Sequence, residues 1–138
     1  MHKIDNTLHP IGYIRSSLKL RKDAPRQGNE GAPNAWIDIA PQFRDAMTDL
    51  NVGESIIVIT WLHQAQRDIL KVHPRDDTTN PLTGVFSTRS SDRPNPLGLH
   101  RVKILDIAVN SIQVAPIEAI DGTPVVDIKP VLTDRADF

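Results

Sequence analysis

The chain has 138 residues and a net charge of −1, from 16 basic and 17 acidic side chains. This length suffices for one domain with a single core, and 39% hydrophobic beside 24% charged residues exclude wholesale disorder. The balanced charge excludes a protein that holds nucleic acid through a broad basic surface, although it is compatible with a local basic patch.

The chain contains no cysteine, which excludes disulfides, thiolate catalysis and zinc–sulfur sites. Its first residues lack the apolar stretch of a signal peptide. The most apolar run, Ile56–Leu62, is too short to cross a membrane. We therefore expect a cytoplasmic protein without a membrane partner.

Two short strands and a long loop are predicted at the start of the chain. Ile11–Arg15 is the first strand, and Ala35–Ile39 is the second because its apolar residues alternate. The segment between them, Ser17–Pro33, is polar and rich in Gly, Pro and Asn. Loops of this length in compact domains are usually either functional or mobile.

A helix and a buried strand are predicted next. Pro41 opens the one helix, where its fixed φ suits the first turn. The residues at the spacing of one apolar face are Phe43, Ala46, Met47 and Leu50. Ser55–Leu62 is a near-continuous apolar run rich in β-branched residues, which predicts a strand buried on both faces.

The second half of the chain predicts only strands and turns. The strands are Asp68–Val72, Gly84–Thr88, Leu97–Ile107, Ser111–Ala115 and Thr123–Lys129. Asp68–Val72 also fits a helix. Leu97–Ile107 and Ser111–Ala115 are predicted to form a hairpin that turns at Val109 and Asn110. Six to eight short strands with one short helix predict a single all-β domain over 1–138, with a closed or strongly curled sheet.

Several common site motifs are absent from the sequence. It contains no G-x-G-x-x-G turn, no P-loop and no G-x-S-x-G elbow, so neither a Rossmann nucleotide site nor a hydrolase nucleophile is indicated. The histidines fall into no metal-ligand spacing; they are His2, His9, His63, His73 and His100. We therefore expect no metal site.

The segment Gly84–Leu99 is a strand that gives way to a polar turn. Its two prolines fix φ and hold Arg93 and Asn95 in extended conformations. Ordering a flexible backbone around a ligand costs about 1–2 kcal/mol per residue. A turn whose φ angles are already fixed by proline loses less entropy, so this cost is smaller. Arg89 and Arg93 offer guanidinium forks for a carboxylate or phosphate. A rigid turn without a ligand explains these residues equally well.

The segment Ile120–Pro130 carries a second turn signal. Asp121 and Gly122 form a tight-turn dipeptide, and Asp127 and Lys129 share one face of the extended piece that follows. Turn chemistry with an ion pair accounts for this segment without any ligand.

Taken together, these segments resemble the TsaA-like, or TrmO-like, family. The matching strings are Ile11–Ser16, Pro25–Gly28, Trp61–Gln64, Gly84–Leu99 and Asp121–Pro130. The resemblance extends from about Ile11 to Leu132, which is essentially the whole chain. Characterised members methylate N6 of threonylcarbamoyladenosine at position 37 of certain tRNAs and use S-adenosyl-L-methionine as the methyl donor.

The resemblance implies a single-sheeted β-barrel that works as a cytoplasmic homodimer, with each cofactor site near the subunit interface and tRNA as a possible partner. It implies an S-adenosylmethionine-dependent methyltransferase. The cofactor-binding positions carried over from the family are Pro25, Arg26, Gln27, His63, Gln64, Arg89, Leu99, Ile120, Asp121, Gly122 and Thr123.

These positions suit the parts of the cofactor. Leu99 and the backbone near Gly122 suit the adenine, and Arg89 or Arg26 suits the methionyl carboxylate. The side chains expected at the ribose are Gln27, Gln64 and Thr123. Methyl transfer also requires that one proton be accepted or relayed, and Asp121 is the predicted catalytic acceptor. Its alternative role is to cap the turn and hydrogen-bond the ribose.

Two other functions stay open at this point. An enzyme of the same fold could methylate a small molecule or a different nucleic acid. A binding module could instead sense S-adenosylmethionine without transferring its methyl group. Six aromatic residues give no independent indication that the chain stacks tRNA bases.

Overall fold

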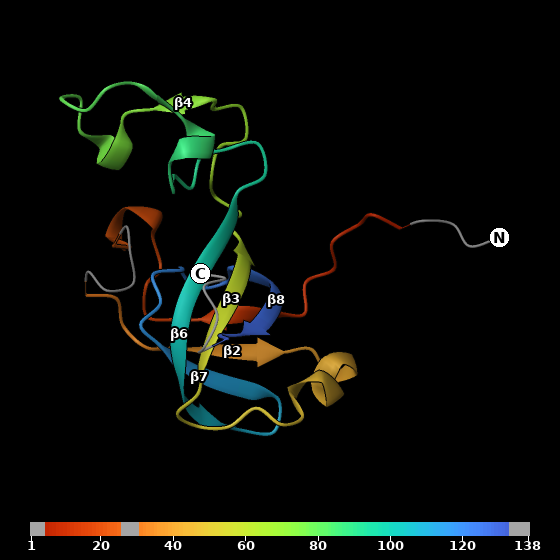
Figure 1. Cartoon of the computed structure of the whole chain (residues 1–138). Helices are drawn as coiled ribbons and strands as arrows, with labels where there is room; N and C mark the ends of the chain where they lie inside the picture. Colours follow the sequence, from red (N-terminus) through yellow and green to blue (C-terminus); the bar gives the residue numbers. More distant parts are fainter. Residues whose placement is uncertain (1–4, 26–30, 133–138) are drawn as a thin grey trace.

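Six antiparallel strands close into a barrel in the computed structural model, which describes residues 5–25 and 31–132 (Figure 1). Their order around the barrel is β1-β2-β7-β6-β3-β8, so the first strand pairs with the last. The barrel strands are β1 (Gly12–Arg15), β2 (Ala35–Ile39), β3 (Ser55–Trp61), β6 (Leu97–Ile107), β7 (Ser111–Ala115) and β8 (Pro124–Pro130). The predicted all-β barrel is confirmed, with strand bounds within one residue of the predicted ones.

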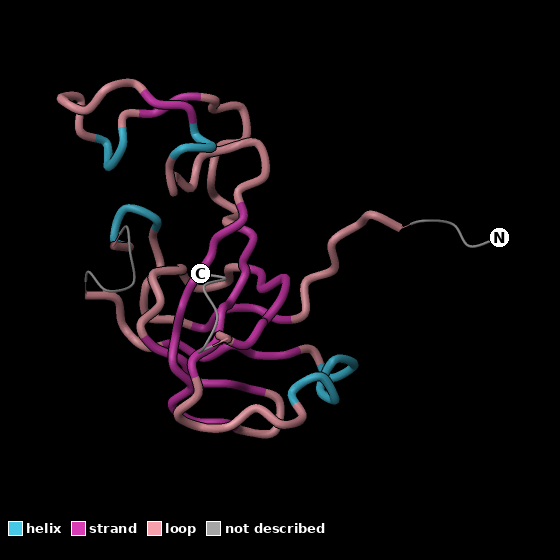
Figure 2. Tube along the Cα trace, viewed as in Figure 1, coloured by secondary structure: helices cyan, strands magenta, loops and turns pink. Residues whose placement is uncertain are grey.

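A lobe made of residues 62–96 projects from one end of the barrel, between β3 and β6 (Figure 1). Most of it is loop and turn (Figure 2). Its regular elements are β4 (Lys71–Val72) and β5 (Thr83–Gly84), which pair as a two-stranded sheet, and the short 3-10 helices η4 (Pro74–Asp76) and η5 (Val85–Ser87).

The two strands predicted in this lobe are shorter than expected. Only the last two residues of Asp68–Val72 and the first residue of Gly84–Thr88 are paired. Val85–Ser87 is a short 3-10 helix instead, and the Val85 carbonyl has partners outside any strand. The Val85 oxygen accepts from the Thr88 amide at 3.1 Å and from Arg93 Nη2 at 2.9 Å, so it cannot join a strand ladder.

The predicted helix is present as η3 (Pro41–Met47), and it is a 3-10 helix. Three of its predicted apolar residues pack against the barrel core, Phe43, Met47 and Leu50, whereas Ala46 is exposed. A further 3-10 helix, η1 (Arg21–Asp23), lies in the loop between β1 and β2. No helix within the described ranges is long and apolar enough to span a membrane.

The core fills the inside of the barrel. Successive side chains of a strand point to opposite faces, so every second residue points inward. Each barrel strand contributes at least one side chain with 2% exposure or less, such as Ile14, Ile37, Val58, Ile104, Val114 and Val125. The strand predicted to be buried on both faces, β3, has Ile56, Ile57 and Val58 all buried.

Gly12 lets β1 approach β2 closely. It pairs with Ile39 of β2 and with Val125 of β8. A Cβ at this position would collide with the backbone oxygen of Asp38 and lie 3.0 Å from its carbonyl carbon. Barrel closure between β2 and β8 therefore depends on glycine at this position.

Replacing Gly12 with Ala should destabilise the barrel by about 1–3 kcal/mol, because backbone atoms cannot move aside as a flexible side chain can. Urea denaturation of the purified protein measures this change. Gly84→Ala is the matched control, since a Cβ there meets nothing within 4 Å. Equal stabilities of the two variants would contradict the close-approach argument.

Candidate functional site

A cavity of about 780 Å³ lies where the lobe meets the end of the barrel. Four segments line it: the η1 turn, the lobe, the start of β6 and the loop between β7 and β8. Pockets for small organic ligands usually measure about 300–1,000 Å³. The cavity therefore has the size of a nucleoside-type ligand site.

The structure brings most of the predicted site residues to this cavity. The predicted residues that line it are Pro25, His63, Gln64, Arg89, Leu99, Ile120 and Thr123. Asp121 and Gly122 are not among its lining residues, and Arg26 and Gln27 lie outside the described residues. Residues from Pro25 to Thr123 in the chain thus converge on one cavity.

Asp121 holds the turn together from beside the cavity. Its carboxylate accepts a hydrogen bond from the Ser16 amide at 3.0 Å and pairs with Lys19 Nζ at 3.1 Å. The Ser16 amide first, and Lys19 second, hold the pKa of Asp121 below its ordinary value. Gly122, at φ 82°, donates its amide to the Ile14 oxygen at 2.7 Å. These contacts are those of a turn cap, and the catalytic role of Asp121 stays a prediction.

The two arginines of Gly84–Leu99 differ in what they bind. Arg93 donates Nη1 to the oxygens of Thr88 and Ser90, at 3.0 and 2.9 Å, as well as Nη2 to Val85. Arg89 is exposed on the cavity wall and makes no hydrogen bond to any described residue. Arg93 therefore shapes the loop, whereas the guanidinium of Arg89 is available to a ligand.

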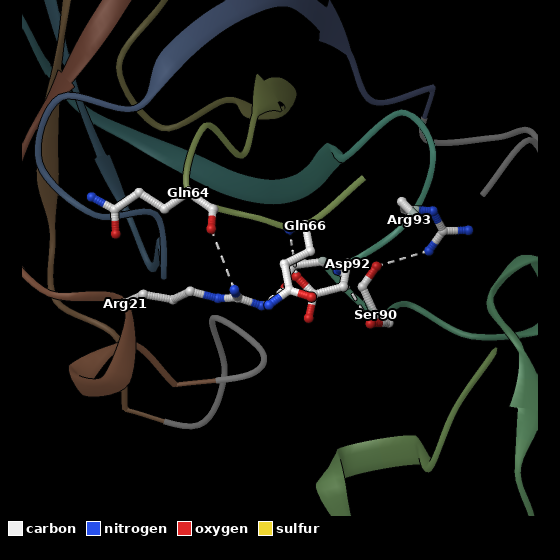
Figure 3. Close-up of polar contacts among 7 residues, drawn as sticks. Arg21, Gln64, Gln66, Ser90, Asp92 and Arg93 are labelled. Carbon is white, nitrogen blue, oxygen red and sulfur yellow. Dashed lines mark hydrogen bonds and ion pairs between the residues drawn. The ribbon is translucent and has the colours of Figure 1, made fainter. Parts of the chain in front are cut away.

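Arg21 connects the η1 turn to the lobe across the cavity (Figure 3). Its Nη2 lies 2.7 Å from Asp92 Oδ1 and 3.0 Å from Ser91 Oγ. The same Asp92 oxygen accepts the Gln66 amide at 2.9 Å. The sequence interpretation did not single out Arg21, whose partner sits 71 residues away. Asp92, inside Gly84–Leu99, was the only signal that could have pointed to it.

Apolar and charged groups share the cavity wall. The larger aliphatic side chains are Leu62, Leu97, Leu99 and Ile120, and the cationic ones are Arg21, Lys22, Arg75, Arg89 and Arg93. The acidic ones are Asp76, Asp92 and Glu118. In residues 5–25 and 31–132, no three His, Cys, Asp or Glu side chains are grouped to hold a metal ion. The wall suits a ligand that has an apolar ring and charged ends.

Asp121→Asn should lower stability at neutral pH by about 0.5 kcal/mol, the order expected of an exposed ion pair. Because the folded-state pKa of Asp121 is lowered, its contribution is complete above the ordinary pKa, about 3.9, and disappears as pH falls through the folded value. Urea denaturation of both proteins between pH 7 and pH 2.5 should show the difference shrinking with acid. A difference independent of pH would show that the charge of this carboxylate does not stabilise the turn.

Sequence comparison identifies relatives over the whole chain. The model of the tRNA-methyltransferase O N-terminal domain matches residues 13–137. A probable S-adenosyl-L-methionine-binding protein of Methanothermobacter thermautotrophicus is 40% identical over 134 residues, which cover 97% of this chain and 96% of the relative. An S-adenosyl-L-methionine-binding protein of Archaeoglobus fulgidus is 42% identical over 122 residues, 88% of this chain and 86% of the relative.

Solved structures show the same fold. A crystal structure of TrmO from Pseudomonas aeruginosa superposes with a TM-score of 0.75 at 28% identity, covering 98% of this chain and 61% of that chain. A further TrmO crystal structure has a TM-score of 0.74 at 29% identity and is covered to 62%. This chain therefore spans about three fifths of the solved TrmO chains. The predicted resemblance is confirmed, and the chain belongs to the family of the tRNA-methyltransferase O N-terminal domain.

Proposed function

We propose that this chain binds S-adenosyl-L-methionine in the cavity and is a methyltransferase acting on N6 of threonylcarbamoyladenosine at tRNA position 37. The observation that carries the proposal is that the longest family-matching segment, Gly84–Leu99, lines one cavity of ligand size together with residues of three other matching segments, namely Pro25, His63, Gln64 and Thr123. The names of the relatives support the cofactor. The family description and the TrmO structures support methyl transfer to tRNA.

The chemistry of the wall fits this cofactor. Its adenine needs an apolar slot, for which Leu99 and Ile120 offer side chains. Its methionyl carboxylate needs a cationic donor, and the exposed guanidinium of Arg89 has no partner among the described residues. Its ribose needs polar partners, for which Gln64 and Thr123 lie on the same wall.

When bound, the cofactor supplies a methyl group already activated by its sulfonium. The residues of the chain then have to position the acceptor nitrogen, exclude water and accept one proton. The Arg21–Asp92 ion pair connects the η1 turn to the lobe, so it holds these two parts of the cavity wall in place relative to each other. We include in the proposal a cytoplasmic homodimer with the cofactor site near the subunit interface, as the family resemblance implies.

A transfer assay tests the proposed reaction. The protein is incubated with methyl-labelled cofactor and tRNA that carries or lacks the threonylcarbamoyl group. Label should appear only in the tRNA that carries the modification, because the proposed acceptor nitrogen belongs to threonylcarbamoyladenosine. The proposed acceptor would be contradicted if calorimetry showed that the protein binds the cofactor while neither tRNA became labelled. That outcome would favour a sensor or a methyltransferase with another substrate.

Arg89→Ala should raise the Kd for S-adenosylmethionine at least tenfold, which is about 1.4 kcal/mol of lost binding free energy. The reason is the loss of a charge-assisted hydrogen bond to the methionyl carboxylate. Isothermal titration calorimetry measures the change. Arg44→Ala is the control, since Arg44 is an exposed arginine of η3 that does not line the cavity. An unchanged Kd for Arg89→Ala would show that this loop is only scaffolding.

A further inference from the structure

A chain of hydrogen bonds runs from the barrel core to the cavity wall through His100. The His100 side chain is 2% exposed, and its Nε2 lies 2.7 Å from Thr60 Oγ1. Its Nδ1 lies 2.6 Å from Glu118 Oε1. His100 and Glu118 both line the cavity, whereas Thr60 is fully buried behind them. Neither Glu118 nor Thr60 was a predicted site residue.

These contacts fix the imidazole and, through it, the carboxylate. An ionised carboxylate only accepts hydrogen bonds, so Nδ1 of His100 carries the proton that faces Glu118. In the neutral ring, Nε2 then accepts the hydroxyl proton of Thr60. With both ring nitrogens satisfied, His100 is not free to bind a ligand itself. Its effect is to hold Glu118 in one orientation at the cavity wall.

Gly98 leaves the space in which this chain of hydrogen bonds forms. It is the partner of Thr60 in the ladder between β3 and β6. A Cβ at Gly98 would lie 2.7 Å from His100 Nε2 and would collide with Thr60 Oγ1. The side chains of Thr60 and His100 therefore meet in the space that the side chain of any other residue at position 98 would fill.

Glu118 has one carboxylate oxygen without a partner. Its Oε1 is bound to His100, but its Oε2 accepts no hydrogen bond from any residue in 5–25 or 31–132. The side chain is only 19% exposed, so water solvates the charge incompletely. Asp92, on the same wall, is compensated by Arg21 and the Gln66 amide. A half-buried carboxylate that lacks such compensation is stabilised by a cationic donor.

We propose that Glu118 binds the α-ammonium group of the methionyl part of the ligand through Oε2. This inference rests on the proposed function, because it assumes S-adenosylmethionine or its demethylated product in the cavity. The adenine, ribose and carboxylate already have proposed partners in the wall, whereas the ammonium, a cation with three donors and no acceptor, has none so far. Arg89 and Glu118 then recognise the two opposite charges of the amino acid end, with His100 and Thr60 as positioning residues.

A comparison of two ligands tests the contact without any methyl transfer. The probes are S-adenosylhomocysteine, whose sulfur is uncharged, and the analogue that lacks only its α-amino group. Calorimetry should show that Glu118→Gln raises the Kd of S-adenosylhomocysteine at least tenfold. The Kd of the deaminated analogue should change less than twofold. Equal losses for both ligands, or no loss for either, would overturn the proposal.

Two further variants separate the contact from an effect on folding. Glu118→Asp keeps the charge, so it should retain a preference for the ligand with the amino group, as the wild type does. Glu54→Gln makes the same chemical change in the turn before β3, at the strand end remote from the cavity, and should change neither Kd. If Glu118→Gln does not fold, the proposal can still be tested with the other two proteins. It would be overturned if both the wild type and Glu118→Asp bound the two ligands with equal Kd.

The outcomes also distinguish this inference from the proposed function. A wild-type protein that binds neither S-adenosylmethionine nor S-adenosylhomocysteine would reject both. Binding by the wild type that Glu118→Gln leaves unchanged would reject only the role of Glu118. Binding that depends on Glu118, without label in either tRNA, would support Glu118 and reject the proposed methyl acceptor.

Discussion

The ladder between β3 and β6 is the constraint on which the site depends. Seven residue pairs, from Ser55 with Lys103 to Trp61 with Leu97, hold these two strands side by side. The lobe is inserted between their ends, so its position over the barrel is set by this ladder (Figure 1). The same ladder places Thr60 opposite Gly98, which lets His100 reach it. The position of the lobe and the geometry of the cavity are therefore consequences of one strand pairing.

Charges around the cavity fall into two groups with different effects. Arg93, Asp92 and Arg21 bind backbone carbonyls, amides or each other, and so they shape the lobe and the η1 turn. Arg89 and Glu118 each leave a polar group without a partner among the described residues. Groups that are already compensated contribute rigidity, whereas groups that are not compensated favour a ligand of opposite charge.

Glu118 and Asp121 show how two carboxylates in one loop can differ in chemistry. Asp121 is turned toward Ser16 and Lys19, and these partners favour its charged form and lower its pKa. A carboxylate stabilised in this way is a weaker base, which suits a turn cap better than a proton acceptor. Glu118, on the cavity wall, is oriented by a buried histidine. The distinction follows from the partners of each carboxylate, which are a backbone amide and a lysine for Asp121 and a buried histidine for Glu118.

The sequence by itself determined the all-β class, six strand positions and the family, because alternation, prolines and long motifs are local patterns. Composition alone could not assign Arg89 and Arg93 different roles, since both are guanidinium forks within one motif; only the family resemblance placed Arg89, and not Arg93, at the cofactor. Only the folded chain brings the Val85, Thr88 and Ser90 carbonyls around Arg93 and joins Arg21 to Asp92. The pairing of His100 with Glu118 and Thr60 likewise spans 18 and 40 residues. Such contacts depend on strand register and loop path, which no local pattern encodes.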